Sequence, residues 1–245
     1  MSQFQSAPKN KLVYRLQDKF YTGFRSPRSD FRTEILKRVS ITSIVLDYGA
    51  GRGRNKLVDF KSIVAKVHGV DVDEAVFENP LLHEARLINE NIIPYGENFF
   101  DIVYSIYVLE HIGKPLSMFK EIWRVLKPGG YFIALTPGSH HYVSLIAKAT
   151  PHSFHEWIVE KTENRKANDT FPTFYRANSE HKITSLAKEA NFLIEKILMK
   201  ENLPVRLSFN PIAFLIGVVY ERVVNTFHRL RHFRGNILII LKKPL

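Results

Sequence analysis

Short apolar runs alternate with amphipathic stretches through the middle of the chain, which predicts alternating strands and helices. The runs expected to form strands are residues 44–47, 65–72, 85–88, 100–106 and 131–136, and then 192–199 and 235–241. Between the fourth and fifth runs, apolar residues from Pro115 to Leu126 recur at steps of three and four, the spacing of one helical face. The Lys-Pro-Gly-Gly sequence at 127–130 should end that helix, and another helix is expected at 181–190. Strands that alternate with helices are typical of an α/β fold with a parallel sheet.

Two stretches depart from this alternation. Residues 138–180 are rich in His, aromatic and polar residues, and a long irregular connection in a compact domain is typical of a lid over a site. Residues 211–234 begin apolar and end basic, which predicts a helix. This helix lies either at a membrane interface, with its bases on anionic headgroups, or over the sheet, with its basic end in solvent. We favour the second position because an expected strand follows it.

Composition narrows the classes of protein. The chain has 245 residues, which suits one domain, and it contains no cysteine. Disulfide scaffolds, thiolate zinc sites and cysteine nucleophiles are therefore excluded. The first eleven residues are polar, and the most apolar stretch, 211–220, is half the length of the roughly 20 residues needed to cross a bilayer. We expect a cytoplasmic protein.

Charge is spread unevenly along the chain. The net charge is +11, of which residues 1–38 carry +6 and residues 196–245 carry +7, whereas the middle carries −2. Basic ends around a near-neutral middle fit an anionic partner, such as a phosphorylated substrate, a membrane surface or RNA. They fit a merely solvated surface equally well.

The segment most informative about chemistry is 45–53, Val-Leu-Asp-Tyr-Gly-Ala-Gly-Arg-Gly. An expected strand runs into Asp47 and then into Gly49, Gly51 and Gly53, before an expected helix. These glycines permit a tight turn and let a ligand touch the backbone. A dinucleotide fingerprint needs its third glycine at the sixth position, where this chain has arginine, so the loop matches a pyrophosphate poorly. A carboxylate at Asp47 suits a ligand with an ammonium group.

A second acid ends the next expected strand. Asp71 lies 20 residues after Gly51, and an acid at that place can accept hydrogen bonds from both hydroxyls of a ribose. It would also repel a 2′-phosphate. Together with Asp47, it favours an adenosine-type ligand with a cationic tail.

Five segments, taken in order, resemble the class I S-adenosylmethionine-dependent methyltransferases of the type 11 branch. They are residues 45–53, 69–71 (Gly-Val-Asp), 99–103 (Phe-Phe-Asp-Ile-Val), 109–112 (Leu-Glu-His-Ile) and 126–130 (Leu-Lys-Pro-Gly-Gly). The resemblance covers about residues 40–137. It implies a Rossmann-like α/β fold, with a seven-stranded sheet in the order 3-2-1-4-5-7-6, strand 7 antiparallel and helices on both faces. It also implies S-adenosylmethionine as cofactor.

Positions in the resembling segments imply roles for individual residues. The resemblance implies that the methionine end of the cofactor contacts Asp47, Gly49, Gly51 and Gly53, and that the ribose contacts Asp71. It implies that Val72 and Asn89 lie beside the adenine, and that Ser105 and Tyr107 lie beside the sulfonium. Family members often place an Asp where this chain has Asn89, whose amide oxygen can still accept from the adenine amino group. The chain then reads as one methyltransferase domain with four parts. These are a basic N-terminal segment (1–38), a cofactor-binding core (39–137), a lid or substrate insertion (138–180), and the C-terminal part of the sheet with its basic helix (181–245).

A methyltransferase must mainly align its acceptor behind a reactive sulfonium methyl and exclude water. An acceptor hydroxyl also needs a base, and His suits that role near neutral pH. Ligands of open α/β sheets bind at the carboxyl ends of strands. The candidate bases are therefore His111, after the fourth strand, and His140 and His141, after the fifth. For each of them a structural or solvated side chain is the alternative.

Residues 152–176 hold two further candidate groups. His152 and His155 lie three residues apart, but no third ligand of suitable spacing is evident, so we expect no metal. With the aromatic segment 171–176, they either line the mouth of the substrate site or form a packed lid without substrate contact.

The expected function is methyl transfer to a small or lipid- or glycan-linked acceptor, at oxygen, by a protein that is cytoplasmic or peripheral at an anionic membrane. The alternatives are a methyltransferase of quinone precursors or RNA, and a non-catalytic scaffold with this fold. No basic–aromatic platform of a known nucleic-acid module is visible in the sequence, which disfavours RNA. The presence of Asp47 and Asp71 disfavours the scaffold.

Overall fold

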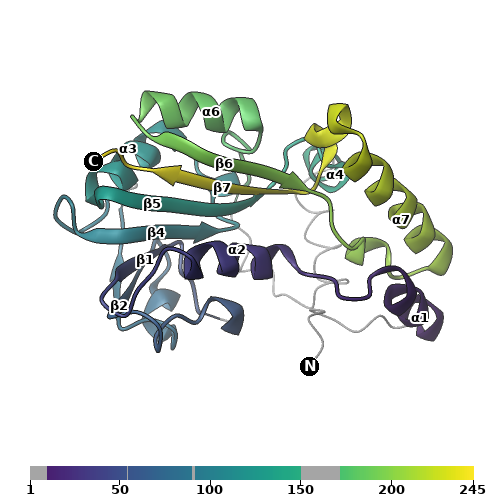
Figure 1. The fold of residues 1–245 in the computed structure, drawn as a ribbon, viewed down its shortest axis with the longest axis horizontal. Helices are drawn as coiled ribbons and strands as arrows, with labels where there is room; N and C mark the ends of the chain where they lie inside the picture. The colour runs from purple at the N-terminus through teal and green to yellow at the C-terminus, as the bar shows by residue number, and fades with distance from the viewer. Residues whose placement is uncertain (1–9, 54, 90–91, 150–171) are drawn as a thin grey trace. The chain divides into compact units, whose positions relative to one another are not determined.

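A computed structural model describes residues 10–53, 55–89, 92–149 and 172–245 (Figure 1). The expectations for His152, His155 and Phe171 fall outside these ranges. The chain divides into two compact units. The first, here the sheet unit, consists of Arg28–Pro137, Thr173–Leu198 and Ile237–Leu245. The second, here the helical unit, consists of Met1–Pro27, Gly138–Pro172 and Met199–Asn236, in so far as these are described.

Seven strands form one sheet in the order β3-β2-β1-β4-β5-β7-β6. They are β1 (Ile44–Tyr48), β2 (Lys66–Asp71), β3 (Glu84–Leu87), β4 (Phe100–Ile106), β5 (Leu126–Pro137), β6 (Leu193–Lys200) and β7 (Asn236–Lys242). The strands from β3 to β5 pair in parallel. Lys243, just after β7, exchanges backbone hydrogen bonds with Gly129 and Gly130 near the start of β5, whereas Gly138 after β5 donates to Gly235 before β7. The two strands therefore run antiparallel, and the expected order and orientation are confirmed.

The helices fill the connections between these strands. The α-helices are α1 (Lys11–Phe20), α2 (Pro27–Leu36), α3 (Pro115–Val125), α4 (Tyr142–Ala149), α6 (Glu180–Glu189) and α7 (Pro211–Thr226). Short 3-10 helices are η1 (Lys56–Val58), η2 (Glu74–Glu78), η3 (Leu109–His111), η5 (Val205–Leu207) and η6 (His228–Phe233). The helices expected at 115–126 and 181–190 are confirmed to within one residue at each end.

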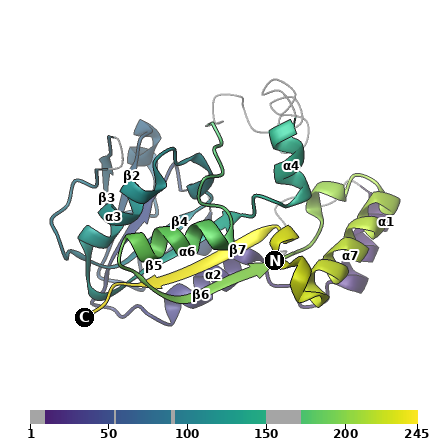
Figure 2. The same cartoon turned by 90° about the horizontal axis from the view of Figure 1, so that it is seen from above.

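Alternating side chains of the strands face two helical layers within the sheet unit. The ring of Phe31 in α2 packs edge-on against Tyr104 of β4, with centroids 6.1 Å apart, and Ile133 of β5 belongs to the same buried cluster. The preceding residue, Phe132, points to the opposite face, where its ring lies 5.5 Å from that of Phe119 in α3. One face of the sheet is thus covered by α2 and the other by α3. Helix α6 lies beside α3 and contacts it (Figure 2).

Three expected boundaries are wrong. The strand expected at 131–136 begins earlier, at Leu126, because the Gly129–Gly130 pair hydrogen-bonds to Lys243 instead of forming a free turn. The helix expected through residue 234 ends at Thr226, and η6 follows it. Residues 55–65, where a helix was expected after the glycine loop, form only η1 and turns. The side chain of Asp59 accepts from the N–H of Lys61 at 3.1 Å there, a local bond that competes with a helical ladder.

The helical unit has its own core. Val13 and Tyr21, at the two ends of the α1 region, pack with Leu203 and with Phe214 and Val218 of α7. Helix α7 packs against α1, η5 and η6, so its buried face belongs to this second core. None of the described helices combines the length and apolar content needed to cross a membrane.

Candidate cofactor site

The loop after β1 depends on glycines with a left-handed backbone. The φ angles are 79° at Gly49, 47° at Gly51 and 66° at Gly53. A Cβ at Gly49 would collide with the side chain of Val108, and one at Gly53 would collide with Asn79. The corresponding direction at Gly51 is open, with nothing within 4 Å. Neighbouring side chains therefore fill the space beside Gly49 and Gly53, whereas the space beside Gly51 is open.

Asn79, directly after η2, holds this loop in place. Its Nδ2 donates to the carbonyl oxygens of Ala50 and Gly51, both at 3.0 Å, and its Oδ1 accepts from the N–H of Leu81 at 2.9 Å. The side chain is buried, and its donors and its acceptor are all used. Asn79 therefore fixes the course of the glycine loop from the neighbouring crossover.

Asp71, the last residue of β2, binds the same loop from another side. Its Oδ2 accepts from the N–H of Gly51 at 2.8 Å, and its Oδ1 accepts from the N–H of Asp73 at 3.0 Å. A carboxylate has about four lone-pair positions, so each oxygen can still accept one more hydrogen bond. That remaining capacity is what a ribose diol requires.

Asp47 lies near the end of β1, beside Tyr104 in the register of the sheet. Burial raises the pKa of Asp47 to about 7, the charge of Asp71 acts in the same direction, and a hydrogen bond with Tyr104 opposes them. A carboxyl group in this state is half protonated near neutral pH. A cation placed beside it would favour the charged form, so the site is poised for a positively charged ligand.

The end of β4 supplies a third group of residues. Ser105 is fully buried, and its Oγ makes no hydrogen bond to any of the residues that the structure describes. Tyr107 has a φ of 56°, an uncommon value for a residue other than glycine, and its N–H donates to the carbonyl oxygen of Leu135 at 2.7 Å. The guanidinium of Arg28 lies 5.0 Å from the centre of the Tyr107 ring. Backbone strain of this kind clusters at functional sites.

A buried chain of hydrogen bonds starts at Glu110 in η3. Burial raises the pKa of Glu110 to about 7, against hydrogen bonds from its own backbone and from Thr136. The Thr136 hydroxyl donates to Oε2 at 3.1 Å, and Nδ2 of Asn178 donates to the Thr136 oxygen at 2.6 Å. The backbone N–H of Phe174 donates to the Glu110 carbonyl oxygen at 2.7 Å. Glu110 therefore ties the ends of β4 and β5 to the segment before α6.

Comparison with known proteins identifies the fold that carries these features. The family described as "Methyltransferase domain" matches residues 46–134, which include the glycine loop, Asp47, Asp71, Asn79 and Glu110. This part of the chain is a methyltransferase domain of the class I S-adenosylmethionine-dependent type, in the type 11 branch.

Individual relatives of this methyltransferase differ in what they act on. An uncharacterized methyltransferase of Schizosaccharomyces pombe is 34% identical over 147 residues, which cover 51% of this chain and 52% of that protein. A ubiquinone biosynthesis O-methyltransferase of Maricaulis maris is 25% identical over 192 residues, 74% of this chain and 68% of that protein. A solved geranyl diphosphate C-methyltransferase of Streptomyces coelicolor, 15% identical, superposes with a TM-score of 0.58 over 99% of this chain and 84% of that one. The chain spans about half the length or less of the first curated relatives it matches.

The residues present in the methyltransferase fit S-adenosylmethionine. Among the described residues, open space faces Gly51 and the buried hydroxyl of Ser105 has no hydrogen-bond partner, and the carboxyl group of Asp47 is poised for a cation. The structure thus gathers most of the predicted cofactor residues at the carboxyl ends of β1, β2 and β4. They are Asp47, Gly49, Gly51, Gly53, Asp71, Val72, Ser105 and Tyr107. Asn89 lies two residues after β3, is exposed, and forms an isolated bridge with Ile92.

The three predicted histidines fall in different units of the methyltransferase. His111 ends η3, just after β4, and is partly buried in the sheet unit. His140 and His141 belong to the helical unit. Nδ1 of His140 lies 3.2 Å from the hydroxyl of Ser139, and Nε2 of the buried His141 lies 3.1 Å from Oε2 of Glu201. Only His111 therefore shares a unit with the cofactor residues.

Sequence reasoning missed four residues that shape these sites. Asn79 stands in an Asn-Pro dipeptide, a turn signal that gave no hint of a contact with the glycine loop. Glu110 belongs to the Leu-Glu-His-Ile segment, in which only His111 was predicted to have a role. Arg28 and Glu201 carry no motif, and each reaches its partner only through the fold.

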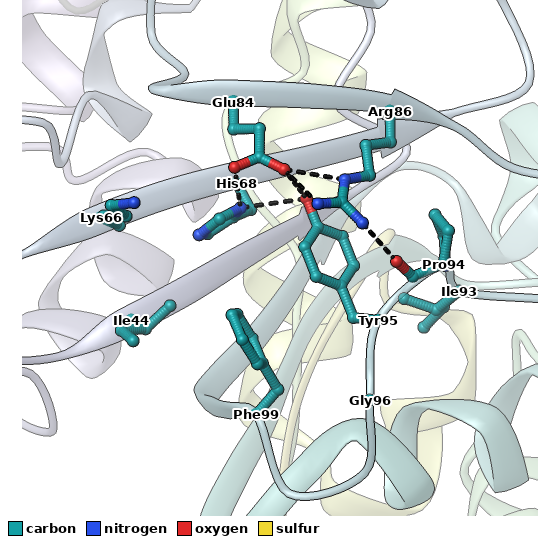
Figure 3. A pocket seen from close by; sticks show the side chains of 10 residues that line it. All are labelled: Ile44, Lys66, His68, Glu84, Arg86, Ile93, Pro94, Tyr95, Gly96 and Phe99. Atoms are coloured by element: carbon teal, nitrogen blue, oxygen red, sulfur yellow. Dashed lines mark hydrogen bonds and ion pairs between the residues drawn. The ribbon is translucent and has the colours of Figure 1, made fainter.

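A cavity of about 540 Å³ lies at the other ends of the strands in the sheet unit, lined by residues such as Lys66 at the start of β2 (Figure 3). Figure 3 shows Arg86 and Tyr95 converging on Glu84, which accepts from them at 2.7 and 3.3 Å. Nδ1 of the buried His68 lies 3.0 Å from the Tyr95 hydroxyl. Because ligands of open α/β sheets bind at the carboxyl ends of strands, this cavity is distinct from the cofactor site.

Proposed function

We propose that the protein transfers the methyl group of S-adenosylmethionine to an oxygen of a small or lipid- or glycan-linked acceptor. When bound, S-adenosylmethionine supplies an electrophilic methyl group on a sulfonium. The observation that carries the proposal is the pair of buried acids Asp47 and Asp71, at the ends of neighbouring strands around one glycine loop. Asp71 would accept from the ribose hydroxyls, and Asp47 would face the cationic end.

Residues at the ends of β2, β3 and β4 would make the remaining contacts with the cofactor. Ser105 and Tyr107 would lie beside the reacting sulfur, and Val72 and Asn89 beside the adenine. Arg28, held over Tyr107, offers a guanidinium for a carboxylate at the same end of the sheet. A buried, preorganised site of this kind aligns the acceptor and excludes water.

His111 is the proposed base. The His111 imidazole would accept the hydroxyl proton of the acceptor as that oxygen takes the methyl group, which S-adenosylmethionine would supply. His111 is favoured over His140 and His141 because it follows β4 directly, in the unit that holds Asp47 and Asp71. The partner of His141, the Glu201 carboxylate, gives that histidine a structural role in the helical unit instead.

A quinone precursor is the second candidate acceptor. It is supported by the relative from Maricaulis maris, whose name assigns it to oxygen methylation in ubiquinone biosynthesis. Such an acceptor is an apolar phenol, so the in-line transfer and the role of His111 would stay the same.

Two experiments test the proposal in sequence. Calorimetric titration with S-adenosylhomocysteine should give a dissociation constant of about micromolar order, and a lack of binding would favour a scaffold without catalysis. The protein is then incubated with radiolabelled S-adenosylmethionine and cell extract, and the lipid, glycan, small-molecule (quinones included) and RNA fractions are separated. Label in the lipid, glycan or small-molecule fraction supports the proposal, whereas label confined to RNA overturns it.

A further inference from the structure

Helix α7 in the helical unit has two apolar faces. Phe214, Val218 and Val224 are buried on one side. On the other side lie Ile212, Leu215, Ile216, Val219 and Val223, here called the α7 stripe. The offsets of three, four, seven and eleven residues from Ile212 place the stripe on a single helical face. The helix is therefore apolar on opposite sides.

Only the first of these faces has a partner in the part of the chain that the structure describes. It packs against α1 through Val13 and Tyr21, and the two helices lie side by side in both views (Figures 1 and 2). In the α7 stripe, by contrast, Ile212 is 71% exposed, Ile216 63% and Val219 62%. Phe209 and Phe227 extend this exposed apolar surface at the two ends of the helix. Adjoining apolar surface of this kind marks an interaction site.

The charge around the α7 stripe has one sign. Between Val205 and Asn236 the chain has five arginines and a single acid, Glu221. Glu221 is buried, where it accepts from the Tyr21 hydroxyl at 3.3 Å and from the side-chain amide of Asn225 at 2.7 Å. Arg206, Arg222 and Arg229 are exposed. The exposed ionisable side chains between Val205 and Asn236 are therefore arginines and histidines, without an exposed acid.

We propose that α7 docks on the surface of an anionic lipid bilayer, with the α7 stripe in the acyl boundary and the arginines on the headgroups. A helix with an apolar face and basic neighbours lies in the plane of such an interface. The stripe is made of aliphatic side chains, without the Trp, Tyr and Arg anchors that dominate the binding energy of protein interfaces. A fluid acyl layer accepts such a stripe without a matching pocket. The inference is independent of methyl transfer.

Flotation of the full chain with vesicles tests the proposal. Vesicles of equal parts phosphatidylcholine and phosphatidylglycerol should carry the protein upward, and vesicles of phosphatidylcholine alone should carry at least about tenfold less. The double variant Ile216→Asp/Val219→Asp should lower binding to the mixed vesicles at least about tenfold, because two charges would enter the acyl boundary. The matched control is Ile41→Asp, at a residue that is 70% exposed in the sheet unit, and it should bind like the parent.

Folding of the variants is checked by their affinity for S-adenosylhomocysteine or, if the parent does not bind it, by circular dichroism. Arg229→Glu, at an exposed residue outside α7, is a second variant that leaves the stripe intact and should weaken binding to the mixed vesicles severalfold. Equal flotation of the double variant and the parent would overturn the proposal, and so would equal binding to neutral vesicles. A dimer of the parent that the double variant abolishes, without vesicle binding, would assign the stripe to a second copy and overturn it too.

Discussion

The side chain of Asn79 occupies the space into which a Cβ at Gly53 would project. The same amide donates to two carbonyl oxygens of the glycine loop, at Ala50 and Gly51. The loop therefore depends on a residue of a different crossover, and the glycine at 53 is required by that contact as well as by its φ of 66°. This pair joins the loop after β1, the strand of Asp47, to the crossover after β2, the strand of Asp71.

The Asn79 contact predicts a large effect of Gly53→Ala. The new methyl group must displace Asn79 and adopt a disfavoured backbone, at a cost of about 1–3 kcal/mol. We expect the affinity for S-adenosylhomocysteine, measured by calorimetry, to fall at least about tenfold. Gly96→Ala is the control, because a Cβ there meets nothing within 4 Å and its φ is not left-handed. Equal losses in the two variants would argue against a special role for the Asn79–Gly53 contact.

Much of the cofactor site could be predicted because its residues follow strands directly. Asp47 and Asp71 are preceded by apolar runs that end at the same edge of a parallel sheet, so their proximity follows from topology alone. Asn79 and Arg28 could not be found in this way. Each lies in a crossover or a helix before the sheet, and its partner is chosen by packing that leaves no local pattern in the sequence.

The proposed ribose contact predicts that Asp71→Ala weakens cofactor binding. The variant loses acceptors for the ribose and also the bond to the N–H of Gly51, so we expect at least about a tenfold loss of affinity for S-adenosylhomocysteine. Glu74→Ala removes an exposed negative charge three residues away and should bind like the parent. An unchanged affinity of the Asp71 variant in calorimetry would place the ribose elsewhere.

The raised pKa of Asp47 predicts how cofactor binding depends on pH. Burial keeps the group protonated in the folded protein up to about pH 7, and a ligand ammonium group favours the carboxylate. Affinity for S-adenosylhomocysteine should therefore rise as the pH increases from about 5 to about 8, with release of a proton at the lower end. Calorimetry in buffers of different ionisation enthalpy measures that proton.

The matched variant Asp47→Asn should bind more weakly and lose most of this pH dependence. It should also be less sensitive to pH in unfolding. The folded pKa of Asp47 lies above the unfolded one, so the parent loses stability as the pH rises from about 4 to about 7, by up to about 4 kcal/mol. Identical pH profiles of affinity for variant and parent would show that Asp47 does not face the cation.

The fold-level predictions failed where a residue pair overrode a local signal. Pro128, Gly129 and Gly130 are strong turn residues, yet they lie within β5 because the end of β7 pairs with them. The helix expected through residue 234 stops at Thr226 although no proline follows it, and the backbone N–H of Phe227 bonds back to Val223 as a cap. The extension of β5 depends on long-range pairing, which spacing along the chain does not report.

The proposed base predicts the kinetics of His111→Ala. Turnover with an identified hydroxyl acceptor should fall by about 10²–10⁴-fold, with little change in the affinity for S-adenosylhomocysteine, because only proton transfer is lost. His181→Ala, at an exposed histidine of α6, should keep the rate of the parent. The rate at a fixed pH decides the role: a variant that turns over the identified acceptor as fast as the parent would remove His111 as the base.

The buried chain from Glu110 through Thr136 to Asn178 predicts an unusual stability profile. Burial raises the pKa of Glu110 to about 7, above its unfolded value, so its contribution to stability is greatest below about pH 4 and declines until the pH passes about 7. Above that pH the parent holds a buried negative charge, which Glu110→Gln removes while keeping the size of the side chain. In urea unfolding followed by circular dichroism, we expect this variant to match or exceed the parent at pH 8.

Two variants of these buried hydrogen-bonded residues separate the effect of the charge on stability from the effect of the hydrogen bonds. Thr136→Val removes the donor to Glu110 and leaves the amide of Asn178 without one of its acceptors, so it should cost about 1–3 kcal/mol at every pH. Glu110→Gln should instead approach the parent at pH 5, where the parent is protonated, and gain relative to it at pH 8. If Glu110→Gln were destabilised equally at both pH values, the carboxyl group would not titrate between them and its raised pKa would be contradicted, because only a group that titrates between them can change the difference.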